Sequence, residues 1–109
     1  MEVTDYTWND GRGQLQHLRR MIARAVTESK GHVAKANWLD AVLNETALAV
    51  TNDVSLTLND LTSDSLSNNT MPDLIHELLQ HTSEASTYGS DYKTQMLSDI
   101  NDAVTELNA

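Results

Sequence analysis

The chain has 109 residues, of which 39% are hydrophobic, with no cysteine, no phenylalanine and a formal net charge of −9 at pH 7. This length gives one domain with a modest core, and the lack of cysteine excludes disulfide bonds, zinc–thiolate sites and thiol nucleophiles. No stretch approaches the roughly 18 apolar residues of a membrane span, and the acidic N-terminus lacks a signal-peptide core, so we expect a cytoplasmic protein.

The charges are distributed unevenly along the chain. Residues 1–35 carry six of the seven Lys and Arg residues with four acids, whereas residues 36–109 carry twelve acids and a single basic residue, Lys93. Such segregation is typical of a protein with one surface for an acidic partner, or for the acidic part of another copy. Leu, Ile and Val supply only 24 residues, so the core is small and association is a natural further source of stability.

Residues 1–13 are predicted to form a flexible N-terminal arm, and residues 14–109 a single helical domain. Tyr6 and Trp8 lie in the arm, outside any periodic pattern. Large aromatic side chains bury much area when they dock, at low entropic cost. These two residues are therefore candidates for a protein interface, packed either on their own subunit or on a neighbour.

The clearest helix is predicted between Gln14 and Lys30. Its apolar residues recur on one arc at about 100° per residue, and Gly31 after it is typical of a helix C-terminus. The apolar residues are Leu15, Leu18, Met21, Ile22, Ala25 and Val26. Basic residues occupy the opposite arc and its approach, and they form the candidate basic interface: Arg12, His17, Arg19, Arg20 and Arg24.

A second helix is predicted from about Val33 to Val50, with Trp38 as its largest buried side chain. Its main apolar face contains Leu39, Val42 and Leu43, among others. Val33 and Leu48 lie off that face. Their position favours a helix that is buried on two sides between neighbours.

Residues 52–66 fit two patterns. Val54, Leu58 and Leu61 have helical spacing, whereas residues 54–58 alternate as in a half-buried strand. Helix is the preferred interpretation, because a lone strand in a helical monomer leaves its backbone unpaired unless another chain supplies a partner strand.

Two further helices follow a polar loop at residues 63–69. The segment 70–73 resembles a capping box, with Thr70 as the N-cap and Pro72 in the first turn, and it begins a helix that runs to about Thr87. Ser90, just after Gly89, is predicted to cap the last helix. That helix carries an acidic stripe, which we treat as a further candidate protein interface: Asp99, Asp102 and Glu106.

Few residues suggest chemistry. Asp73, Glu77 and His81 recur every four residues, but the chain has no His-x-x-x-His or Glu-x-x-His pair, so a hydrated polar helix flank is favoured over a metal site. No nucleophile elbow, glycine-rich phosphate loop or dinucleotide fingerprint is present. We therefore expect no enzyme activity, no metal, no cofactor and no small-molecule substrate.

The sequence thus predicts an all-α protein, a small bundle of four to five short helices in which residues 52–66 are possibly extended. We expect a non-enzymatic subunit that oligomerises or docks onto a larger protein complex through complementary charge. In size and class it is similar to small helical proteins of phage heads and necks, and for a phage component the expected location is the virion. In size and charge it also resembles the small acidic inhibitors of restriction or CRISPR enzymes that imitate DNA, which is the alternative function.

Two other interpretations of the basic arc stay open at this point. A nucleic-acid partner is less favoured, because the strongly negative remainder of the chain repels DNA and RNA at range. In the other interpretation, the basic arc pairs with the acidic stripes of later helices of the same chain or is only solvated. It then has no partner outside its own subunit.

Overall fold

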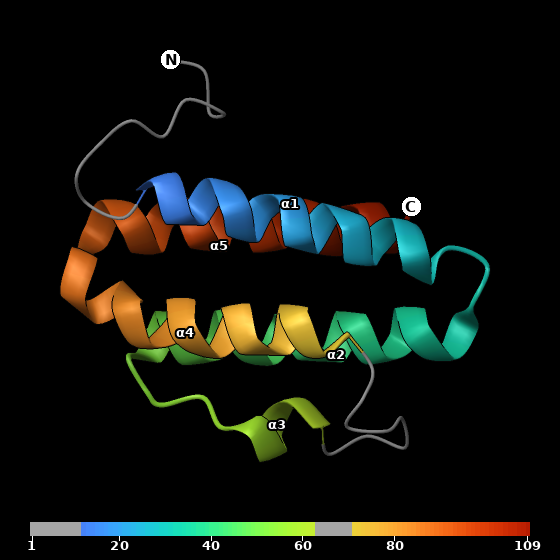
Figure 1. The fold of residues 1–109 in the computed structure, drawn as a ribbon, viewed down its shortest axis with the longest axis horizontal. Helices are drawn as coiled ribbons and strands as arrows, with labels where there is room; N and C mark the ends of the chain where they lie inside the picture. The colour runs from blue at the N-terminus through green and yellow to red at the C-terminus, as the bar shows by residue number, and fades with distance from the viewer. Residues whose placement is uncertain (1–11, 63–70) are drawn as a thin grey trace.

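The computed structural model describes residues 12–62 and 71–109, without the side chains of residues 12–14 and 62. The described residues form five helices and no strand (Figure 1). The helices are α1 (Arg12–Ser29), α2 (Val33–Asn52), α3 (Leu58–Thr62), α4 (Pro72–Tyr88) and α5 (Ser90–Leu107). The prediction of a small all-α bundle is confirmed.

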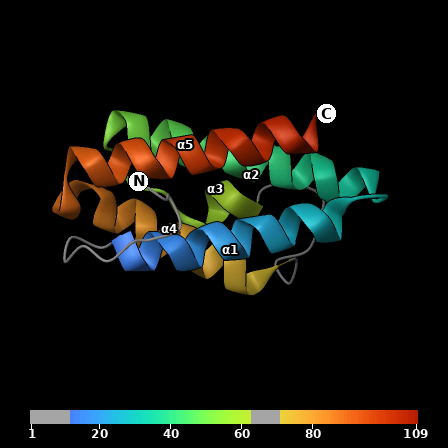
Figure 2. The ribbon, with the colours of Figure 1, turned by 90° about the horizontal axis from the view of Figure 1, so that it is seen from above.

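The four long helices form two layers, with α1 and α5 in one and α2 and α4 in the other (Figure 1). The helices within a layer run in the same direction, and the two layers run in opposite directions. Figure 2 shows α5 lying over α2 and α1 over α4, and both pairs are in contact. Among the described residues α3 contacts α2 and α4 but neither α1 nor α5, so it lies on the outside of the second layer.

Each long helix contributes one apolar stripe to a single core, as expected for amphipathic helices. In α1, five of the six apolar residues predicted from the period are buried, and Met21 packs half-buried against them. Trp38 of α2 is fully buried, and its indole Nε1 donates to the carbonyl oxygen of Leu61 at 3.1 Å. This bond satisfies the one polar group of the indole and holds α3 against α2.

The prediction that α2 is buried on two sides is wrong. Val33 and Leu48 are 77% and 57% exposed, so α2 packs along one face only. Val33 is the first residue of the helix, and Leu48 lies on the outer stripe with Asn44 and Glu45, beyond the reach of the neighbouring helices. The apolar residues of α2 that lie away from its main stripe therefore did not indicate a second buried face.

The described part of residues 52–66 is helical at its two ends and contains no strand. α2 continues to Asn52 and ends at Asp53, whose φ of 53° lies in the left-handed region that Asp tolerates. Residues 54–57 form neither helix nor strand, and α3 follows. Leu56 packs against the core, whereas Val54 and Leu58 are exposed, so the alternating pattern did not mark a buried strand face.

The starts of the last two helices differ from the predicted caps. Pro72 stands in the first turn of α4 as expected, but the N-cap is Met71, and Thr70 lies outside the described residues. Ser90 is the first residue of α5 and not its cap. The N-cap is Gly89, whose φ of 97° and ψ of −168° are accessible almost exclusively to glycine, so this residue alone turns the chain from α4 into α5.

α3 begins with a capping box that the sequence analysis missed. The Thr57 hydroxyl accepts a hydrogen bond from the Asp60 amide at 3.2 Å, and the Asp60 carboxylate accepts one from the Thr57 amide at 3.0 Å. A helix of five residues has little stability of its own, so α3 depends on this box and on the bond to Trp38.

Replacing Thr57 with alanine is therefore expected to destabilise α3 by about 1 kcal/mol. Hydrogen exchange at the α3 amides should accelerate about fivefold, because exchange of a locally opening helix follows its opening free energy. Amides in the middle of α1, which α3 does not contact, serve as the internal control. Unchanged protection of α3 would show that the capping box contributes nothing measurable.

Candidate functional site

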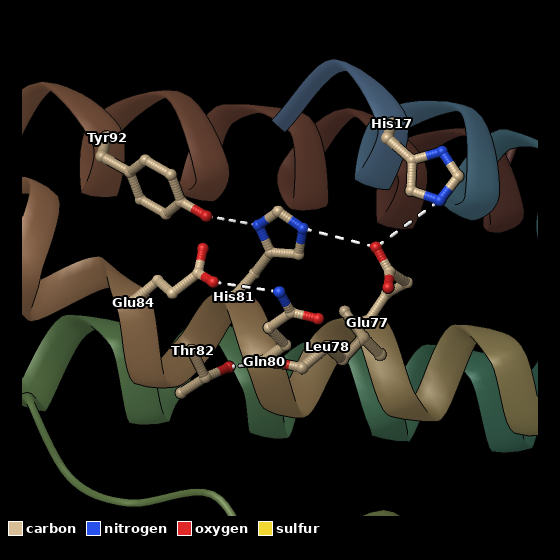
Figure 3. A network of polar contacts seen from close by, with 8 residues as sticks. All are labelled: His17, Glu77, Leu78, Gln80, His81, Thr82, Glu84 and Tyr92. Atoms are coloured by element: carbon tan, nitrogen blue, oxygen red, sulfur yellow. Dashed lines mark hydrogen bonds and ion pairs between the residues drawn. The ribbon is translucent and has the colours of Figure 1, made fainter. Parts of the chain in front are cut away.

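A buried polar network joins α4 to α5 on the side of α4 that faces α1 (Figure 3). His81 of α4 and Tyr92 of α5 are 1% and 0% exposed, and the Tyr92 hydroxyl contacts Nδ1 of His81. Nε2 of His81 lies 3.5 Å from Oε1 of Glu77, one turn earlier in α4. The same oxygen lies 3.6 Å from Nε2 of His17 in α1. The network thus connects three helices.

The partners of His81 determine its protonation pattern. A neutral imidazole with its proton on Nε2 donates to Glu77 and accepts at Nδ1 from the Tyr92 hydroxyl. Burial lowers the pKa of His81, and this effect outweighs the carboxylates of Glu77 and Glu84, which raise it. Burial also raises the pKa of Tyr92, with the Glu84 carboxylate adding to the shift. Both side chains are therefore neutral at pH 7.

Glu84 borders the network on its other side. Its Oε1 accepts a hydrogen bond from Nε2 of Gln80 at 3.0 Å. Its Oε2 is buried without a hydrogen-bond partner among the described residues, and Figure 3 shows this oxygen pointing toward Tyr92. Besides Nδ1 of His81, the Tyr92 hydroxyl therefore has a second hydrogen-bond acceptor nearby, Oε2 of Glu84.

A carboxylate, an imidazole and a hydroxyl in series have the connectivity that activates nucleophiles in hydrolases. Here the hydroxyl is fully buried, and four hollows of the described part of the chain have linings that include neither His81 nor Tyr92. No substrate reaches the hydroxyl through these hollows. We interpret the network as a structural one, which satisfies buried polar groups and fixes how α4 and α5 pack.

The prediction of a hydrated polar flank on α4 is wrong for His81. The signal was present, because His81 lies on the same arc as Leu74, Leu78 and Ala85, at intervals of three or four residues. Asp73, which shares the spacing of Glu77 and His81, is exposed at the start of α4. Within the described residues no three His, Cys, Asp or Glu side chains are placed to hold a metal ion.

The cations of α1 and its C-terminal turn fall into two groups, the first of which pairs with the acidic stripe of α5. Nε of Arg19 lies 3.9 Å from Oδ1 of Asp99, a buried carboxylate that also accepts from Nε2 of Gln95 at 3.1 Å. Beyond the helix end, Lys30 lies 3.5 Å from Glu106. For these residues the internal match between basic arc and acidic stripe holds, because α1 and α5 lie side by side in one layer.

Arg20 and Arg24 form the second group. Both are exposed, they are one helical turn apart, and neither has an ion-pair partner within residues 12–62 and 71–109. His17, also exposed, lies one turn before Arg20. We call His17, Arg20 and Arg24 the α1 stripe. The side chain of Arg12, and Tyr6 and Trp8, which were predicted to belong to the same or a neighbouring interface, lie outside the described residues.

No protein-family model matches this chain, and no curated protein or solved structure matches it either. None of the described helices combines the length and the apolarity needed to cross a membrane.

Proposed function

We propose that this protein is a non-enzymatic interaction or assembly subunit, and that the α1 stripe is its contact surface for a carboxylate-bearing protein. The observation that supports the proposal is that some cations have an ion-pair partner within the described part of the chain and others do not. Arg19 pairs with Asp99, Lys30 with Glu106, and Lys93 with Asp53 at 2.8 Å, whereas Arg20 and Arg24 have no such partner in the described part of the chain.

Two arginines one turn apart suit an acidic protein surface. Each guanidinium presents a planar fork of donors that matches a carboxylate, and residues four apart on a helix are neighbours about 6 Å apart. Arginine is also enriched at the centres of protein interfaces. The net charge of −9 opposes a nucleic-acid partner, because it repels phosphates at range.

The alternative function, inhibition by imitating DNA, has less support. It needs the acidic stripe of α5 to present carboxylates outward as a row. Asp99 is buried and pairs with Arg19, and Glu106 pairs with Lys30, so two of the three carboxylates are engaged within the subunit.

Replacing Arg20 and Arg24 with glutamine is expected to weaken binding to an acidic helix about tenfold. Two exposed ion pairs contribute about 0.7 kcal/mol each, and 1.4 kcal/mol corresponds to a factor of ten. The probe is a short labelled helical peptide with glutamates four residues apart, followed by fluorescence anisotropy at low salt.

The matched control replaces Lys30 and Lys35 with glutamine. It removes the same number of exposed positive charges near the turn between α1 and α2. If both double variants lose affinity equally, only net charge matters, and the α1 stripe is not a specific contact surface. Retained affinity in the arginine variant also contradicts the proposal.

A further inference from the structure

The face formed by α2 and α3 contains an acidic hollow. Its volume is about 270 Å³, and it lies between the two helices. The polar residues of its lining are Glu45, Asn59 and Asp60, and the buried side chains of Trp38 and Leu61 also line it. Glu45 is exposed and has no ion pair among the described residues, so the hollow carries uncompensated negative charge.

Two exposed apolar residues lie close in sequence to residues of this lining. Leu48 lies one turn after Glu45 on the outer stripe of α2, and Leu58 opens α3 directly before Asn59. Leu58 is 51% exposed, and Leu48 is exposed to a similar extent. Burial of these apolar side chains against a partner adds a favourable contribution to the attraction between charges.

The α1 stripe and the acidic hollow lie on opposite layers of the bundle. α3 contacts α2 and α4 of the second layer, whereas α1 belongs to the first layer and does not contact α3 (Figures 1 and 2). The arginines of one molecule therefore do not reach the hollow of the same molecule. A second copy brings two guanidinium groups to two carboxylates, with opposite charges in equal number.

We infer that the acceptor for Arg20 and Arg24 is the Glu45–Asp60 hollow of a second copy of this chain, and that the protein assembles head to tail. The inference rests on the proposed function of the α1 stripe. Because the two contact surfaces are different and belong to different layers of the bundle, each added copy leaves one surface of each kind open. Growth continues into a filament, or into a ring if the rotation between copies closes.

Two variants that each disable one surface test this arrangement. The first replaces Arg20 and Arg24 with glutamine and keeps the hollow. The second, Glu45→Gln with Asp60→Asn, keeps the α1 stripe, and the amide oxygen at position 60 still accepts the hydrogen bond from the Thr57 amide. The matched control, Asp73→Asn with Asp91→Asn, removes two exposed acids that belong to neither surface.

Sedimentation velocity at rising protein concentration gives the readout. The wild type and the control are expected to exceed the 12.1 kDa monomer mass increasingly with concentration, and less so at high salt. Each surface variant alone is expected to stay monomeric up to a protein concentration at least tenfold above the one at which the wild type begins to associate. An equimolar mixture of the two surface variants forms a dimer and nothing larger, because one intact surface of each kind remains.

Three outcomes overturn the inference. A wild type that stays monomeric at every concentration contradicts self-assembly, and a mixture that stays monomeric while the wild type assembles contradicts the pairing of these two surfaces. Assembly that survives Glu45→Gln with Asp60→Asn but not the arginine variant places the acceptor elsewhere. In each of these cases binding of the acidic peptide by Arg20 and Arg24 decides separately whether the proposed function holds.

Discussion

Replacing Tyr92 with phenylalanine is expected to lower the free energy of unfolding by about 1–3 kcal/mol. The change removes only a hydroxyl group, and the stacking of the ring on Tyr88, with centroids 5.0 Å apart, remains possible. Nδ1 of His81 then loses its donor in a fully buried site, and the buried Oε2 of Glu84 loses the one hydroxyl toward which it points. Urea denaturation at about pH 8, where His81 is neutral, measures the loss.

Tyr88→Phe is the matched control for this prediction. Tyr88 is half-buried one turn before Tyr92, and its hydroxyl has no hydrogen-bond partner among the described residues. We expect its removal to change stability by no more than about 0.5 kcal/mol. Equal effects of the two substitutions would mean that the contact between Tyr92 and His81 does not stabilise the fold.

Lowering the pH from about 8 to about 5.5 is expected to destabilise the protein through His81. Its pKa in the folded chain lies below the ordinary value of 6.5, because burial disfavours the imidazolium despite the carboxylates of Glu77 and Glu84. The unfolded chain therefore takes up the proton first. The free energy of unfolding is greatest above pH 6.5, and it falls below that pH until the folded-state pKa is reached. Each unit by which the pKa of His81 in the folded chain lies below its pKa in the unfolded chain corresponds to a loss of about 1.4 kcal/mol in the free energy of unfolding.

The structure also indicates how the network responds to this proton. Once Nδ1 of His81 carries a hydrogen, it donates to the Tyr92 oxygen, and the Tyr92 hydroxyl must donate elsewhere. Oε2 of Glu84 is the nearby acceptor that has no other partner among the described residues. Glu84→Gln replaces this carboxylate, so we expect the variant to lose more stability over the same pH interval than the wild type does.

Two measurements check the pH dependence. Urea midpoints recorded across the interval should fall in the wild type and in His76→Gln, an exposed control on the same helix, and should stay nearly flat in His81→Gln. A side-chain NMR titration of the folded wild type gives the pKa of His81 directly, without any substitution. A pKa at or above 6.5 would contradict the assigned environment.

The long helices were predictable because their apolar residues keep one period over several turns. In α1 the arc from Leu15 to Val26 is the buried face, and Gly89 correctly marked the boundary between the last two helices. α3 was harder, since a helix of five residues is too short for a period to separate it from a strand. It is stabilised by a side chain distant in sequence, Trp38.

The candidate site was predictable only in part. Arg19 and Arg20 are adjacent in sequence and of the same residue type, yet Arg19 pairs with Asp99 and Arg20 is exposed. Successive helical residues point about 100° apart, and which of them meets an acid depends on the neighbouring helix. The acidic hollow was not found from the sequence at all, because Glu45 and Asp60 belong to separate helices.

The sequence by itself determined the helical class, the core-facing stripe of each long helix and the concentration of positive charge in the first third of the chain. These depend on residue spacing along one helix. The tertiary structure decided which charges are neutralised and which polar groups are buried: α5 brings Tyr92 to His81 and Asp99 to Arg19, whereas no described acid meets Arg20 or Arg24. Pairing and burial are properties of neighbouring helices, and a helical period contains no information about which helix its neighbour is.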